Sequence, residues 1–151
     1  MDKITTCLWF DHEAEEAARF YVSIFRNATL LSAGGTSVTF ELNGQRFIGL
    51  NGGPDYTFTP AVSFMIDCAT QADVDHYWDR LGEGGQAGRC GWLVDRFGLS
   101  WQVVPTCLGD LLADDDDAKS EAVLHAMLQM TKLDIAALEA AARNASASAA
   151  T

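Results

Sequence analysis

The sequence predicts an α+β protein in which two βαβββ modules form an open, curled mixed sheet, followed by a C-terminal helical extension. A repeat carries this prediction. The amphipathic stretch that opens at residues 8–11 (Leu-Trp-Phe-Asp) has a counterpart that opens at 64–67 (Phe-Met-Ile-Asp). The turn around 40–44 is echoed by the turn around 94–98. Self-similarity at a nearly constant separation is the signature of a duplicated supersecondary unit.

The repeat and the change of pattern behind it divide the chain into segments of a single domain. Residues 1–107 hold the paired modules, at about 1–53 and 60–107, and residues 108–143 form the helical extension of the same domain. Residues 144–151 are rich in Ala and Ser, so we expect a disordered tail there. A chain of 151 residues is long enough to bury a core of its own.

The first module is predicted from alternation, capping and turn chemistry. Its strands are expected at 4–10, 28–33, 37–42 and 46–51. Asp11 is the expected N-cap of the intervening helix, whose apolar residues recur every three or four positions as far as Phe25. Asn43-Gly44 predicts a type I′ hairpin turn, because that turn needs positive φ at both central residues.

The second module repeats this order. Its strands are expected at 61–67, 92–95 and 99–104, with a short edge strand inside the glycine-rich segment 82–91. Thr70 and Asp73 form a capping box at the start of its helix. In the extension, four consecutive acids at 114–117 introduce one or two helices, since carboxylates complement the positive end of a helix.

The composition of the chain indicates which binding partners and which cellular compartment to expect. The 21 acidic residues outnumber the 10 basic ones, giving a net charge of -11, which disfavours nucleic acid and anionic membrane surfaces. No apolar run approaches the roughly 20 residues that span a bilayer, and the first residues do not resemble a signal peptide. The four cysteines form no C-x-x-C pair. We therefore expect a cytoplasmic protein with reduced thiols, with neither nucleic acid nor membrane as a partner.

Candidate ligand-binding residues come from the strands and hairpin that would line a concavity between the modules, which is the default place for a ligand. They are Cys7, Trp9, Asn51, Trp92, Trp101 and Gln102. Trp92 and Trp101 offer flat apolar walls, and Gln102 offers an amide. An equally open alternative is that both tryptophans form hairpin core and Gln102 makes an internal hydrogen bond. Asp95 and Arg96 are expected to shape the turn.

The same strands argue against a metal or a cofactor. The four segments expected to line the concavity, 4–10, 46–51, 61–66 and 99–104, contain no His, Asp or Glu, whereas a divalent metal needs several converging ligands. No G-x-G-x-x-G follows a strand, so a nucleotide or S-adenosylmethionine site of the Rossmann type is not predicted. We expect neither metal nor cofactor. We keep a catalytic Cys–His pair as an open alternative, because the two residues of such a pair need not be adjacent in sequence.

Several motifs, in order along nearly the whole chain, resemble one family. They are residues 8–11, 14–21, 40–45, 51–54, 90–105, 126–130 and 133–135. These look like the PhnB-like branch of the vicinal oxygen chelate superfamily, the glyoxalase, bleomycin-resistance and extradiol-dioxygenase group, a branch often labelled 3-demethylubiquinone-9 3-methyltransferase. The resemblance implies paired βαβββ modules and, commonly, a homodimer.

The resemblance also implies where catalytic relatives would place metal ligands. The corresponding positions are approximately Thr6 (or Ile4), Gly49, Ala61 and Gln102. Only Gln102 carries a side chain that coordinates readily, where catalytic relatives commonly carry Glu. This departure from the family pattern puts metal-dependent chemistry in doubt.

Three functional hypotheses follow, and whether the protein is an enzyme is left open among them. The first is a metal-free homodimer that binds a small, partly apolar molecule of unknown identity in the sheet cavity. The second is a metal-dependent lyase, isomerase or dioxygenase of the superfamily. The third is a methyltransferase, as the label suggests.

Overall fold

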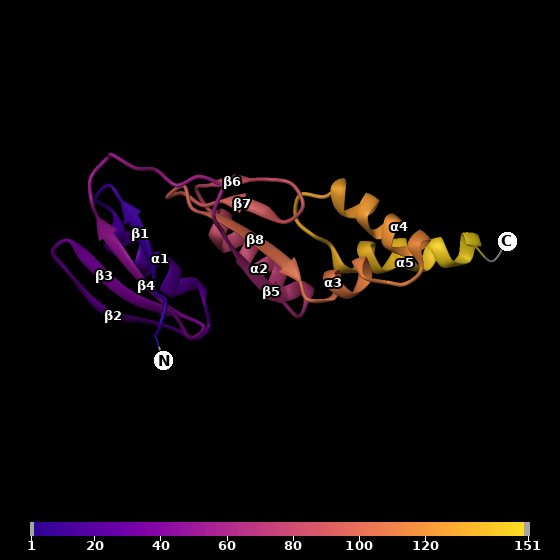
Figure 1. Cartoon of the computed structure of the whole chain (residues 1–151), viewed down its shortest axis with the longest axis horizontal. Helices are drawn as coiled ribbons and strands as arrows, with labels where there is room; N and C mark the ends of the chain where they lie inside the picture. Colours follow the sequence, from indigo (N-terminus) through magenta and orange to yellow (C-terminus); the bar gives the residue numbers. More distant parts are fainter. Residues whose placement is uncertain (1, 150–151) are drawn as a thin grey trace. The chain divides into compact units, whose positions relative to one another are not determined.

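The computed structural model describes residues 2–149 and confirms the α+β repeat (Figure 1). The chain forms two compact units, 1–59 and 60–151, and each contains one repeat with its own four-stranded mixed sheet. Neither sheet closes on itself. Among the described residues, no helix is both long and apolar enough to cross a bilayer.

The first unit has the predicted order of elements. They are β1 (Thr6–Phe10), α1 (Ala14–Ile24), β2 (Ala28–Gly34), β3 (Ser37–Leu42) and β4 (Gln45–Asn51). The strand order is β1-β4-β3-β2, with β1 parallel to β4 and the other pairs antiparallel. The predicted hairpin turn is confirmed, because Asn43 and Gly44 have φ of 49° and 85°.

Helix α1 covers one face of this sheet. Val38, Phe40 and Leu42 alternate along β3, are buried, and face the helix. Gly49 on β4 also faces α1: a Cβ there would lie 2.8 Å from a methyl carbon of Val38 and 3.3 Å from the Cβ of Ala14. A glycine at this position therefore allows helix and sheet to approach closely.

The predicted cap of α1 was wrong. The helix begins at Ala14, and Glu13 at the N-cap position makes no capping hydrogen bond with its side chain. Instead, the side-chain oxygen of Asn51 accepts a hydrogen bond of 2.9 Å from the backbone N–H of Ala14. A cap supplied from 37 residues away is invisible to reasoning that considers only sequence neighbours of the helix.

The second unit repeats the topology. Its elements are β5 (Ser63–Cys68), α2 (Gln71–Gly82), β6 (Gln86–Ala87), β7 (Trp92–Val94) and β8 (Ser100–Pro105), with strand order β5-β8-β7-β6. Strand β5 is parallel to β8. The predicted cap of α2 is confirmed, since the hydroxyl of Thr70 accepts a hydrogen bond of 3.1 Å from the N–H of Asp73.

The extension contains three helices in the described range, where the sequence indicated one or two. They are α3 (Cys107–Leu112), α4 (Asp117–Leu128) and α5 (Ile135–Ala149), which lie together in Figure 1. Their core consists of Leu108, Val123, Leu133 and Leu138, all buried. The acidic run does start α4, because the Asp116 carboxylate accepts a hydrogen bond from the N–H of Ala118. Helix α5 includes 144–149, where a disordered tail was expected, as alanine favours helix strongly; residues 150–151 lie outside the described range.

Hydrogen bonds from α2 and from the residues before β7 hold the extension in place. The amide of Gln71 on α2 accepts from the N–H of Ile135 at 2.8 Å, which caps α5, and donates to the carbonyl of Leu133 at 3.2 Å. Just before β7, the N–H groups of Cys90 and Gly91 donate to the carbonyls of residues 130 and 131. The extension is therefore built into the second unit.

An ion pair at the same junction should make stability depend on pH. Lys132 Nζ lies 2.9 Å from the Asp75 carboxylate, and hydrogen bonds from Gln71 and Lys132 lower the pKa of Asp75. A carboxyl whose pKa is lower in the folded state than in the unfolded state stabilises the folded state at pH values above its ordinary pKa. This stabilisation is lost as the pH falls. We expect Lys132→Met to lower the melting temperature near pH 7 and to have a smaller effect at about pH 2.5, because Asp75 takes up a proton as the pH falls through its lowered pKa.

Calorimetric melting curves at the two pH values test this expectation. Lys119→Met, which changes another lysine of the extension, is the matched control. An equal loss for Lys132→Met at both pH values would show that the Asp75 pair does not support the junction.

Candidate functional site

The candidate site is the face of the second sheet opposite α2, which we call the Gln102 face. Along β8, Trp101 and Val103 are buried on the α2 side, so Ser100 and Gln102 lie on the other side. The strand register places two rows of side chains across this face: Trp92–Gln102–Met65 and Val94–Ser100–Ser63. The arrangement is a column of uncharged polar groups on β8, flanked by apolar side chains on β7.

Hydrogen bonding distinguishes the three polar groups of the Gln102 face. Gln102 Nε2 donates to Ser63 Oγ at 2.9 Å, so the predicted internal hydrogen bond of Gln102 is present. Ser100 is only 1% exposed, and its hydroxyl has no hydrogen-bond partner among the described residues. Buried polar atoms without a partner are rare and call for an explanation.

Sequence reasoning missed Ser63 and Ser100 as site residues. A signal existed for Ser100, because alternation along β8 puts residues 100 and 102 on one face. The position of Ser63 beside them depends on the parallel register of β5 with β8, which no local pattern encodes.

The two tryptophans of the hairpin have different environments. Trp92 is half-buried on the Gln102 face, whereas Trp101 is 3% exposed and belongs to the core on the α2 side. The carboxylate of Asp95 accepts from the indole N–H of Trp101 at 2.9 Å and from the N–H groups of Phe97 and Leu99 at 2.8 and 3.1 Å. The predicted role of Asp95 in shaping the turn is thus present, and Trp101 is part of that turn's support.

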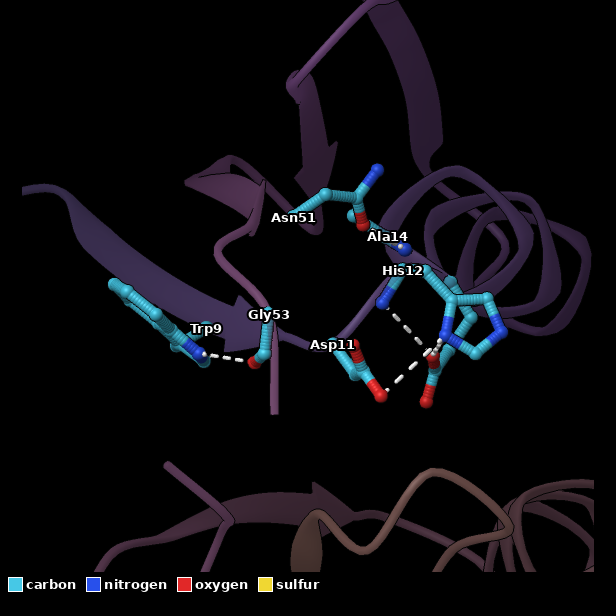
Figure 2. A network of polar contacts seen from close by, with 7 residues as sticks. Trp9, Asp11, His12, Ala14, Asn51 and Gly53 are labelled. Carbon is cyan, nitrogen blue, oxygen red and sulfur yellow. Dashed lines mark hydrogen bonds and ion pairs between the residues drawn. The ribbon is translucent and has the colours of Figure 1, made fainter. Parts of the chain in front are cut away.

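In the first unit, Cys7 and Trp9 lie on the face of β1 that points away from α1, because the buried Leu8 and Phe10 face the helix. The indole N–H of Trp9 donates to the carbonyl of Gly53 at 2.9 Å (Figure 2). A Cβ on Gly52 would lie 2.2 Å from the Trp9 ring, so the ring lies directly against glycine backbone. With its N–H already bonded, Trp9 can offer a ligand only its ring.

Asn51 lies on the opposite side of the first sheet from Trp9. Its side chain points to the start of α1 and caps Ala14 (Figure 2). The neighbouring His12 is exposed, with Nδ1 3.3 Å from the Glu13 carboxylate and 3.6 Å from that of Asp11. Asn51 therefore ties the end of β4 to the start of the helix, and His12 lies beside two carboxylates at that start.

Three of the positions that the resemblance implies for metal ligands, Gly49, Ala61 and Gln102, do not fit a divalent ion here. Gly49 has no side chain and faces α1, and Gln102, whose Nε2 donates to Ser63, can offer only a single neutral amide oxygen. Ala61 precedes β5 and has no ligating atom in its side chain. Over the described part of the chain, no three His, Cys, Asp or Glu side chains are grouped so as to hold a metal ion.

The cysteines should differ in reactivity. Cys7 is exposed, whereas Cys68 is buried, and burial together with the nearby Asp73 and Asp67 raises the pKa of the Cys68 thiol to about 11. Only the thiolate reacts readily. We expect iodoacetamide at about pH 8 to modify Cys7 rapidly and Cys68 only after unfolding, as measured by peptide mass spectrometry. Equal rates for the two cysteines would contradict the buried position of Cys68.

Comparison with known families identifies the family of this chain. A model of the 3-demethylubiquinone-9 3-methyltransferase family matches residues 2–104, which includes nearly all of both repeats. The chain belongs to this family. The match ends at residue 104, so the resemblance expected at 126–130 and 133–135 is not part of it, and α3 to α5 lie beyond the matched region.

Solved structures agree with membership of this family. The chain is similar to a putative 3-demethylubiquinone-9 3-methyltransferase, PhnB protein, from Bacillus cereus, with 34% identity over 69% of this chain and 99% of that one, at a TM-score of 0.64. A Pseudomonas aeruginosa protein shares the fold at 16% identity over 70% and 98% of the two chains, with a TM-score of 0.57. A glyoxalase/bleomycin resistance protein from Albidiferax ferrireducens does so at 11% identity over 67% and 95%, with a TM-score of 0.51. No curated protein matches.

Proposed function

We propose that this family member binds a small, partly apolar molecule on the Gln102 face, without a metal ion. The observation that carries the proposal is the row Trp92–Gln102–Met65, in which one amide lies between an indole and a thioether. Met65 is 59% exposed and Trp92 is half-buried, so both have apolar surface left to contact a ligand. Small-molecule sites typically combine such apolar walls with a few polar groups that fix orientation.

Intrinsic fluorescence during titration with a library of neutral and charged metabolites tests this proposal. Binding on the Gln102 face should change the emission of Trp92, and Trp92→Phe should remove the change. Trp78→Phe is the matched control, because Trp78 lies on α2 and outside the two rows. A library that leaves the spectrum unchanged, or a response that survives Trp92→Phe but not Trp78→Phe, would refute the proposal.

The family description supports methyl transfer as a second candidate function. A methyltransferase of this kind needs a methyl donor as well as its acceptor, so calorimetric titration with S-adenosylmethionine separates it from a simple binding protein. Saturable binding of the donor in the micromolar range would favour methyl transfer over the first proposal. Metal analysis of protein purified without chelators, followed by assays with added metal, tests the lyase, isomerase or dioxygenase alternative in the same way.

The proposal includes a homodimer. Strands β1 and β5 lie at sheet edges, and within residues 2–149 each leaves one edge without a neighbouring strand. An unpaired edge readily pairs with another chain. Sedimentation equilibrium at micromolar concentration should give twice the 16.3 kDa of the chain. A single-chain mass across the accessible concentration range would contradict the dimer.

A further inference from the structure

The hydroxyl of Ser100 is the starting point, because it lacks a hydrogen-bond partner in a buried position. It is the one buried side-chain polar atom, among those that the structure describes, with no such partner. Ser100 lies on β8 between Val94 of β7 and Ser63 of β5, and on the same face as Gln102. An unused donor and acceptor are thus present within the site of the proposed function.

The neighbouring polar groups also keep hydrogen-bonding capacity. Gln102 uses one N–H to reach Ser63 Oγ, which leaves its second N–H and its carbonyl oxygen available. Ser63 accepts that bond, so its own hydroxyl proton remains available as a donor. Together with Ser100, these residues form a compact group of neutral donors and acceptors.

The charge around the two rows bears on the charge that a ligand can carry. Their six side chains, Trp92, Gln102, Met65, Val94, Ser100 and Ser63, include no acid and no base, and the next residue on this face of β5, Asp67, is an exposed acid beyond them. A buried ligand charge without a partner is costly, and the net charge of -11 on the chain further opposes an anion. Neutral hydroxyl and amide groups pair best with a neutral carbonyl or amide.

We propose that the Gln102 face recognises a flat, uncharged molecule through a carbonyl or amide group that hydrogen-bonds to Ser100 and Gln102, while its ring lies against Trp92 and Met65. This inference rests on the proposed function and adds the chemical class of the ligand. It also explains the unpartnered hydroxyl, since the ligand supplies the missing hydrogen bond.

Three probes with the same ring and different charge test the ligand class: benzamide, benzoate and benzylamine. Ligand-observed NMR titrations of the full chain should show benzamide binding at least about fivefold more tightly than the other two, and Ser100→Ala should weaken benzamide binding about fivefold. Trp92→Phe should weaken all three probes. Equal binding of the three probes, or unchanged benzamide binding by Ser100→Ala, would overturn the inference while leaving the proposed function standing.

Thermal stability provides an independent readout. Because the Ser100 hydroxyl is buried without a partner, Ser100→Ala should keep or raise the melting temperature. Ser63→Ala, the matched control, should lower it, since this change removes the acceptor of the Gln102 bond. A marked loss of stability in Ser100→Ala would mean that the hydroxyl already has a partner, which would refute the inference. If neither the probes nor the metabolite library bind, the proposed function fails as well.

Discussion

Asp95→Ala should destabilise the second unit by about 3 kcal/mol or more. The Asp95 carboxylate accepts three hydrogen bonds, from the indole of Trp101 and from the backbone of Phe97 and Leu99. Alanine would leave these donors without their acceptor, and Asp95 and Trp101 are each only 3% exposed. A buried donor that loses its partner costs about 1–3 kcal/mol, so the sum is large even if the turn relaxes.

Urea unfolding followed by near-ultraviolet circular dichroism measures this loss. Asp95→Asn should cost roughly half as much, because one amide oxygen can still accept while the amide N–H₂ group faces a donor. Asp79→Ala, an exposed change on α2, is the matched control and should stay within about 0.5 kcal/mol of the parent. An Asp95→Ala protein as stable as Asp79→Ala would show that the three hydrogen bonds do not support the hairpin.

Gly85→Ala should have a comparable effect through overpacking. A Cβ at residue 85 would lie 2.2 Å from the carbonyl oxygen of Val94 and 2.9 Å from backbone atoms of Asp95. Side chains can turn aside, but these atoms are backbone, so the pairing of β6 with β7 must shift. We expect a loss of about 2–4 kcal/mol, at the upper end of measured overpacking costs.

Gly82→Ala is the matched control for Gly85→Ala. Residue 82 ends α2, and a Cβ added there would meet no other atom within 4 Å, so alanine should be neutral or stabilising by up to about 1 kcal/mol. Thermal unfolding of both variants gives the comparison. Equal melting temperatures would contradict the close approach of residue 85 to β7.

Much of the fold follows from local signals. The turn at Asn43-Gly44, the cap at Thr70 and the alternation along β3 each depend on neighbouring residues, and each is present in the structure. The cap of α1 was misassigned to Asp11 because its true partner, Asn51, is distant in sequence. Local patterning therefore predicts elements well and contacts between elements poorly.

The candidate site was predictable only in part for the same reason. Trp92 and Gln102 stand in a conspicuous polar-aromatic cluster, and both lie on the face that we propose binds a ligand. Trp101 belongs to the same cluster but lies on the opposite face, bonded to Asp95. Ser63 belongs to the Gln102 face only because the parallel register of β5 with β8 places it beside Ser100. Successive residues of a strand point to opposite faces of the sheet, so an error of one residue in the assumed alternation places a side chain on the wrong face.

The hydrogen bonds of the extension affect the order in which the two repeats can fold during translation. Cys90 and Gly91, immediately before the strand that carries Trp92, donate hydrogen bonds to residues 130 and 131. The ribosome adds those acceptors about 40 residues later, when the whole first repeat has long been made. The first repeat can therefore fold early during translation, whereas the hydrogen bonds just before Trp92 cannot form until residues 130 and 131 have been synthesised.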